Sequence, residues 1–200
     1  MSRELLTAKY PEAQAGLIKY ADWLVTAGVE RGLIGPRETE RIWERHIANC
    51  AALEELIPDG ARVIDIGSGA GLPGLVLAIV RPDLHVTLIE PLQRRCDFLN
   101  EVVVDLELSD RVEVIRGRAQ DAPVAKADVV TARAVAPLKK LLSWALPLVA
   151  HGGQVLAMKG SSAPQEIIDA ASVLKKRTAE VVLCGHGVVD PLTTVVRVSS

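Results

Sequence analysis

From Pro58 to the C-terminus, short apolar runs alternate with longer segments in which apolar residues recur at helical spacing. Such runs, bounded by Gly, Pro or Asp, predict strands, and the longer segments predict helices. The predicted strands are Val63–Ile66, His85–Glu90, Val112–Arg116, Asp128–Ala132, Gln154–Met158, Glu180–Cys184 and Thr193–Val198. The predicted helices are Leu92–Asp105, Leu138–Val149 and Pro164–Lys176. This alternation predicts an α/β fold with a doubly wound, mostly parallel, seven-stranded Rossmann-like sheet.

The last two predicted strands break the alternation, because only Gly185–Leu192 separates them. A connection this short suits a hairpin and cannot hold the crossover that parallel strands need. We therefore expect the C-terminal hairpin to give the sheet an antiparallel edge strand.

Residues 1–57 show a helical pattern without predicted strands. One helix is predicted at about residues 11–27, a loop at Gly28–Pro36, and a second helix at about Arg37–Ile57. One face of the second helix carries Ile42, His46, Asn49, Leu53 and Ile57, beside Trp43, Ile47 and Cys50. This spacing predicts that the face packs on the main domain. We expect an N-terminal helical region at residues 1–57 and a main domain at residues 58–200.

A four-glycine loop follows the first strand of the main domain, in the run Val63-Ile64-Asp65-Ile66-Gly67-Ser68-Gly69-Ala70-Gly71-Leu72-Pro73-Gly74. Glycine adopts backbone angles that a Cβ forbids, and its missing side chain lets a ligand lie against the main chain. The loop leads into a helix, whose first N–H groups bind polar or anionic ligand groups. The segment therefore predicts a nucleotide-cofactor site.

Two cofactors compete for this loop. Gly69–Gly74 satisfies the dinucleotide pattern G-x-G-x-x-G, whereas Asp65, Gly67, Gly69 and Gly71 satisfy the acid-and-glycine pattern of S-adenosylmethionine enzymes. A dinucleotide fingerprint should begin at the strand end, Gly67, and from there Leu72 stands where the third glycine belongs. The Asp65 carboxylate suits a ligand with positive amino and sulfonium groups and would repel a pyrophosphate. We therefore favour S-adenosylmethionine over NAD.

Glu90 ends the second predicted strand, 25 residues after Asp65. A carboxylate at that position can accept hydrogen bonds from both hydroxyls of an adenosine ribose, which either cofactor carries. The C-terminal hairpin distinguishes between the two cofactors, because such a hairpin is expected of S-adenosylmethionine methyltransferases and is unusual for NAD domains.

Composition restricts the class of protein. The 200 residues are 49% hydrophobic, which suits one main domain with a real core, and no segment resembles a signal peptide or a membrane span. We expect a soluble, cytoplasmic protein. Cys50, Cys96 and Cys184 are far apart and form no C-x-x-C pair, so we expect neither disulfides nor a metal site.

Charge gives no overall attraction to nucleic acid, since the formal net charge is −2. Residues 1–57 contain 7 Lys and Arg against 9 Asp and Glu, and residues 58–200 contain 16 of each. Any RNA contact must therefore depend on cations that the fold gathers locally.

Ligands of open α/β sheets bind beyond the carboxyl ends of the strands, so the residues after each strand are candidates for the site. Arg133 and Lys159 follow neighbouring strands and could face a polyanion bound over the cofactor. Each could instead have only a structural role, Arg133 by holding the loop or the start of the next helix. His46 is either a buried histidine between the two regions or a histidine of the substrate pocket. The chain has no Asp/Asn-Pro-Pro-aromatic motif, no cysteine in a loop that follows a strand and no obvious catalytic base. These absences favour a nucleophile without a proton, such as guanine N7.

Four segments together resemble the small-subunit ribosomal RNA methyltransferase G family, also called glucose-inhibited division protein B. They are Trp43-Glu44-Arg45-His46-Ile47, Asp65–Gly74, Arg133-Ala134 and Met158-Lys159-Gly160. The resemblance spans nearly the whole chain and implies S-adenosylmethionine-dependent methylation of one guanine N7 in 16S rRNA. The implied partner is 16S rRNA or the small ribosomal subunit, and we expect a monomer.

The resemblance also assigns residues. It places cofactor contacts at Gly67, Leu72, Ala119, Gln120 and Arg133, with His46 and Lys159 on the substrate side. Gln120 departs from the expected glutamate, but its carbonyl can still accept from an adenine amino group. Two other functions remain open: a small-molecule methyltransferase, for which the 3% aromatic content supplies few lid residues, and a non-enzymatic S-adenosylmethionine-binding module.

Overall fold

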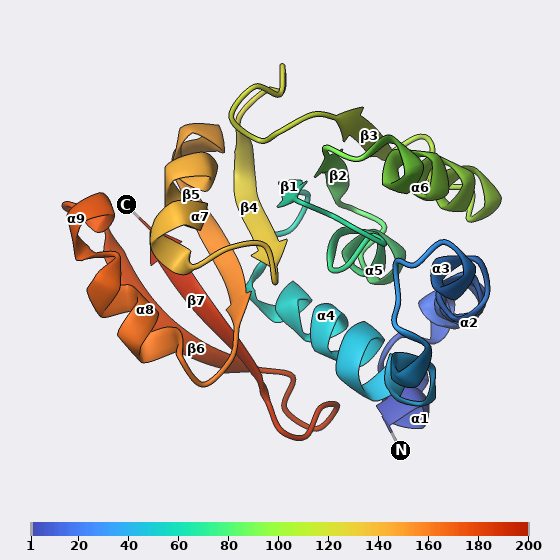
Figure 1. Cartoon of the computed structure of the whole chain (residues 1–200). Helices are drawn as coiled ribbons and strands as arrows, with labels where there is room; N and C mark the ends of the chain where they lie inside the picture. The colour runs from blue at the N-terminus through green and yellow to red at the C-terminus, as the bar shows by residue number, and fades with distance from the viewer. Residues whose placement is uncertain (1, 200) are drawn as a thin grey trace.

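A computed structural model describes residues 2–199. Their strands form one seven-stranded sheet in the order β3-β2-β1-β4-β5-β7-β6, in which only β7 is antiparallel (Figure 1). The strands are β1 (Arg62–Ile66), β2 (His85–Glu90), β3 (Val112–Arg116), β4 (Ala127–Arg133), β5 (Val149–Lys159), β6 (Thr178–Cys184) and β7 (Thr193–Ser199). The predicted α/β fold with its mostly parallel sheet is therefore confirmed.

The sequence suggested that the antiparallel strand lies at the edge of the sheet, but it lies inside the sheet. β7 lies between β5 and β6, and β6 forms the edge of the sheet. The reason lies in the side chains of the two strands. Val195 and Val196 of β7 point to opposite faces and are both fully buried, which suits an interior strand, whereas Val181 and Leu183 of β6 are exposed.

Helices cover both faces of the sheet. The helices α5 (Gly74–Val80) and α6 (Gln93–Asp105) lie on one face, and α7 (Leu138–Ala145), α8 (Ala163–Asp169) and α9 (Ala171–Leu174) lie on the other (Figure 1). Successive side chains of β1 point to opposite faces of the sheet, so that Val63 belongs to one hydrophobic cluster and Ile64 to the other.

Two predicted helices are shorter or more broken than expected. The helix predicted at Leu138–Val149 ends at Ala145, and a 3₁₀ turn over Leu146–Leu148 contains Pro147, which has no N–H to continue an α-helix. The helix predicted at Pro164–Lys176 is divided at Ala170 into α8 and α9. It ends before Lys175, whose φ of 55° leaves the helical region.

The N-terminal region is helical, as predicted, but its segments differ. It begins with α1 (Ser2–Lys9), which the sequence did not predict, followed by a 3₁₀ turn (Pro11–Ala13), α2 (Gln14–Val25) and α3 (Ala27–Glu30). The single helix predicted at about Arg37–Ile57 is a chain of short segments. These are a 3₁₀ segment (Pro36–Arg41), a π-helix (Ile42–Ala48), α4 (Asn49–Ala51) and a second 3₁₀ segment (Ala52–Leu56).

The predicted apolar face of this segment is buried. Ile47 and Leu53 are fully buried and share one hydrophobic cluster with Leu75 and Leu77 of α5. The helical region and the sheet thus share a core, and the boundary between residues 57 and 58 stays a prediction. Among the described residues, no helix combines the length and the apolar character that crossing a membrane requires.

One buried hydrogen bond ties the N-terminal region to the glycine loop. Tyr20 of α2 is fully buried, and its hydroxyl donates to the carbonyl oxygen of Ala70 at 2.7 Å. Because that carbonyl lies on the loop between β1 and α5, α2 helps to set the position of the loop.

Replacement of Tyr20 by phenylalanine should lower the free energy of unfolding by about 1–3 kcal/mol, because it leaves a buried carbonyl without its donor. The measurement is urea denaturation followed by circular dichroism. Tyr10→Phe is the matched control: it removes a bond to Glu54 Oε1, a half-buried carboxylate that keeps other cationic partners. Equal losses in the two variants would contradict the special role of the Tyr20 bond.

Candidate functional site

The glycine loop has the backbone that its sequence predicted. Gly67, Gly69 and Gly71 have φ values of +66°, +59° and +99°, in the left-handed region that side chains rarely adopt. A Cβ on Gly67 would come within 2.9 Å of Val135 Cγ2. The path of the loop between β1 and α5 therefore favours glycine at all three positions, and at Gly67 the lack of space for a Cβ adds to this preference.

Glu90 fixes the loop beside the end of β2. Its carboxylate is 1% exposed and accepts from the backbone N–H groups of Gly69 and Leu92, each at 3.0 Å. Arg95 Nη1 lies 3.6 Å from Glu90 Oε2. Since two carboxylate oxygens offer about four acceptor sites, Glu90 retains capacity for ligand hydroxyls.

Asp65, in β1 just before the loop, is fully buried. Its Oδ2 accepts from the N–H of Gly74, the first residue of α5, at 3.1 Å, and its Oδ1 has no hydrogen-bond partner. Burial raises the pKa of this carboxyl to about 7, although the bond from Gly74 opposes the shift. Asp65 thus holds the start of α5 and is not among the residues that line the cleft, and its contact with the cofactor stays a prediction.

A cleft of about 700 Å³ opens at the carboxyl ends of β1, β2 and β4. It brings together four predicted residues, Gly67, Glu90, Ala119 and Gln120. The other predicted cofactor residues, Asp65, Gly69, Gly71, Leu72 and Arg133, are not among its lining. The remaining lining residues are Ile66, Ile89, Pro91, Leu92, Arg95, Gly117, Arg118, Ala134, Val135, Lys140 and Trp144.

Arg95, Lys140 and Trp144 were missed by the sequence reasoning. Each lies in the helix that follows a strand end, α6 or α7, while the sequence argument stopped at the residues directly after each strand. Extending that argument into the first two turns of the next helix would have found them.

Arg133, at the end of β4, points toward the N-terminal region. Its Nη1 donates to Cys50 Sγ at 3.2 Å, and its Nη2 donates to the carbonyl oxygen of Arg45 at 3.1 Å and contacts His46 Nδ1 at 3.0 Å. His46 Nε2 lies 2.9 Å from Glu38 Oε2. His46 is therefore a contact between the two parts of the chain.

Lys159, at the end of β5, is held inside the protein. Only 11% of its side chain is exposed, and its Nζ donates to Glu166 Oε2 and to the carbonyl oxygen of Ala136, both at 2.7 Å. Glu166 Oε2 also accepts from the N–H of Leu138, the first residue of α7. The pair thus anchors the loop after β4, which includes two cleft residues, Ala134 and Val135. Direct contact of Lys159 with RNA stays a prediction.

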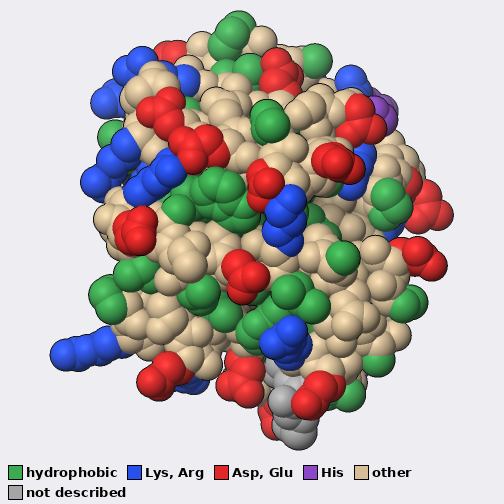
Figure 2. Space-filling view, turned by 90° about the vertical axis from the view of Figure 1, so that its right-hand side faces the viewer, with side chains coloured by type: hydrophobic (Ala, Val, Ile, Leu, Met, Phe, Trp, Pro, Cys, Tyr) green, Lys and Arg blue, Asp and Glu red, His purple; other side chains and the backbone are tan. Residues whose placement is uncertain are grey.

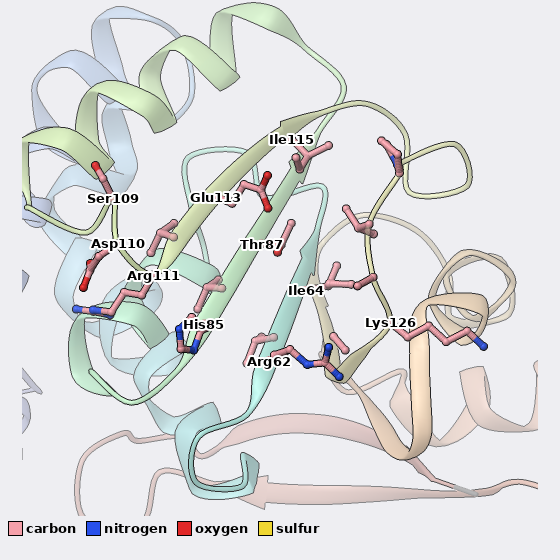
Figure 3. A pocket seen from close by; sticks show the side chains of 17 residues that line it. Arg62, Ile64, His85, Thr87, Ser109, Asp110, Arg111, Glu113, Ile115 and Lys126 are labelled. Atoms are coloured by element: carbon pink, nitrogen blue, oxygen red, sulfur yellow. The ribbon is translucent and has the colours of Figure 1, made fainter.

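A second hollow, of about 350 Å³, lies on the sheet at the opposite ends of β1, β2 and β3 (Figure 3). Three long cations line it, and two of them, Arg111 and Lys126, extend away from each other at opposite ends of the hollow. None of the predicted site residues lines it. Among the described residues, no group of three or more His, Cys, Asp or Glu is arranged to hold a metal ion.

The residues of the cleft fit S-adenosylmethionine. The volume is in the range of small-ligand sites, Glu90 offers acceptors for a ribose, and Gly67 presents bare backbone. Val135, Ile66 and Leu92 provide apolar surface for an adenine ring, and Gln120 lies beside them at the cleft.

Comparisons with known proteins agree with this fit. The family described as rRNA small subunit methyltransferase G matches residues 13–188. The ribosomal RNA small subunit methyltransferase G of Thermobifida fusca is 57% identical over 202 residues, which cover 99% of this chain and 83% of that protein.

Solved structures show the same fold at low identity. A putative S-adenosyl-L-methionine-dependent methyltransferase from Methanococcus maripaludis has a TM-score of 0.61 at 15% identity, covering 77% of this chain and 85% of that one. A putative rRNA methylase from Clostridium thermocellum has a TM-score of 0.54 at 18% identity, covering 75% and 92%. Sequence and fold thus lead to one conclusion: the chain belongs to the rRNA small subunit methyltransferase G family and is an S-adenosylmethionine-dependent methyltransferase.

Proposed function

We propose that this chain transfers a methyl group to N7 of a guanine in 16S rRNA, in the small ribosomal subunit. The relatives named as ribosomal RNA small subunit methyltransferase G support the RNA substrate. Such a substrate places the enzyme in the cytoplasm, where ribosomes are assembled. Within the chain, the proposal depends on the chemistry of the cleft.

The N7 assignment depends on which titratable side chains line the cleft. Its lining contains one carboxylate, Glu90, and three cations, Arg95, Arg118 and Lys140, and it contains no His, Cys, Tyr or Asp. Glu90 already accepts two backbone N–H groups. Methylation of an amine or a hydroxyl needs a group that removes a proton, whereas guanine N7 carries a free lone pair at neutral pH.

The chain supplies binding and alignment. S-adenosylmethionine, when bound, supplies an electrophilic methyl group on a sulfonium centre. We propose that Glu90 accepts the ribose hydroxyls, that Gln120 contacts the adenine, and that the backbone at Gly67 borders the methionine part. Gly69, Gly71 and Leu72 shape the loop, and Asp65 supports it through the bond to the N–H of Gly74. In-line positioning of the two substrates then provides most of the rate enhancement.

Local cations support an RNA substrate despite the net charge of −2. Arg95, Arg118 and Lys140 border the cleft, where they can neutralise phosphates on either side of an exposed base. The face shown in Figure 2 differs, because acidic and basic side chains are interspersed on it and no patch of one sign covers it. We therefore propose that RNA approaches the cleft.

The cofactor assignment predicts that Gly67→Ala weakens S-adenosylmethionine binding by about tenfold or more, because the Cβ collides with Val135 and disfavours the positive φ. Isothermal titration calorimetry measures the affinity, and circular dichroism checks the fold. Gly160→Ala is the control, since a Cβ there meets no atom within 4 Å. Unchanged affinity in a folded Gly67→Ala protein would refute the role of the loop.

The N7 assignment predicts a specific product. After incubation with S-adenosylmethionine and either small ribosomal subunits or naked 16S rRNA, the RNA should break at one guanine on treatment with borohydride and aniline, which is selective for 7-methylguanine. RNA incubated without the enzyme should stay intact. Recovery of an amino-methylated or carbon-methylated base without cleavage would overturn the assignment and leave the methyltransferase class intact.

A further inference from the structure

Three side chains from separate segments form a chain of contacts next to the cleft. Glu38 lies in the 3₁₀ segment Pro36–Arg41, His46 in the π-helix and Arg133 at the end of β4. The imidazole stands between the other two, with Nε2 2.9 Å from Glu38 Oε2 and Nδ1 3.0 Å from Arg133 Nη2. Only 13% of the His46 side chain is exposed, whereas 31% of the Glu38 side chain is exposed, so the imidazole is the more enclosed of the two partners.

The chemistry of the partners decides the tautomer of His46. A guanidinium has N–H donors and no acceptor, so His46 Nδ1 must be unprotonated to accept from Arg133. A neutral imidazole then carries its proton on Nε2, where it donates to the Glu38 carboxylate. Both ring nitrogens thus have a suitable partner only in the neutral Nε2–H form.

The surroundings of His46 favour this form. Burial lowers the pKa of the imidazole, as do the nearby charges of Arg133 and Arg45, while Glu38 raises it. Protonation would place an Nδ1–H against a guanidinium N–H, two donors facing each other at hydrogen-bond distance. Arg133 would then lose one of the contacts that hold its side chain against residues 45–50.

Arg133 connects this network to the cleft. It directly precedes Ala134 and Val135, which line the cleft, and Ala134 has a φ of 54°, a conformation that costs energy for a residue with a Cβ. The guanidinium fixes one end of this strained loop, and the Lys159–Glu166 pair fixes the other through Ala136 and Leu138. A change at Arg133 therefore reaches the wall of the cleft.

We propose that His46 is a positioning residue: in its neutral Nε2–H form it holds Arg133, and through it the Ala134–Val135 wall, in the geometry that methyl transfer requires. This inference rests on the proposed function. It assigns His46 no part in the chemical step, and it makes methyl transfer dependent on the deprotonated imidazole.

The test is the pH profile of kcat/KM for methylation of small ribosomal subunits. The wild-type rate should fall as the pH drops through the pKa of His46. Glu38→Gln keeps an acceptor for Nε2–H but removes the charge that favours imidazolium, so the acidic limb should move to lower pH. Arg45→Gln removes a neighbouring positive charge, so the limb should move to higher pH. Each shift should be at least about 0.3 pH unit.

Two variants of His46 distinguish a positioning role of this residue from a role in packing alone. His46→Phe fills the space without an acceptor and should lower kcat/KM by about tenfold or more. His46→Asn offers an amide oxygen near the place of Nδ1 and cannot titrate, so it should recover most of that loss and abolish the acidic limb. An acidic limb that persists unchanged in His46→Asn would overturn the proposal.

An NMR titration of the imidazoles tests the contact independently of activity, because the chain has only 4 histidines. Arg133→Gln should raise the pKa of His46, since it removes a nearby cation. An unchanged His46 titration in that variant would overturn the inference even if the enzyme is active. If the wild-type protein methylates no ribosomal RNA, the proposed function fails, while this titration still decides whether Arg133 controls His46.

Discussion

Two buried carboxylates at neighbouring strand ends hold the loop on which the rest of the site depends. Asp65 accepts from the N–H of Gly74, where the loop meets α5, and Glu90 accepts from the N–H of Gly69 within the loop. Such bonds keep a strained, glycine-rich backbone in one conformation, because a buried N–H without an acceptor would cost about 1–3 kcal/mol. The two carboxylates therefore hold the loop in the conformation that exposes Gly67 to the cleft.

The N-terminal region contributes to the same site from the other side. Tyr20 bonds to the carbonyl oxygen of Ala70 in the loop, and His46 contacts Arg133 at the end of β4. Both contacts are buried or partly buried, and both join segments far apart in the sequence. The helical region thus sets the geometry of the loop and of the strand ends as well as covering one face of the sheet.

The sequence predicted the elements better than the contacts. All seven strands and the glycine loop follow from patterns of a few adjacent residues, which short-range rules describe, whereas the bond between Glu90 and the loop did not follow from them. The interior position of β7 did not follow, because strand order depends on packing between distant segments. The sequence did not predict two contacts for the same reason: that of Lys159 with Glu166 and that of Arg133 with His46. A cation at a strand end can point toward RNA or back into the protein, and its tertiary partners determine which.

The central claim is that the cleft at the carboxyl ends of β1, β2 and β4 holds S-adenosylmethionine. Hydrogen–deuterium exchange with and without the cofactor tests it directly. The account predicts slower exchange at residues 67–71, 90–92, 117–120 and 134–135, and no change at residues 109–113 and 123–127 around the second hollow. Protection of the second hollow, with unchanged exchange in the glycine loop, would contradict it.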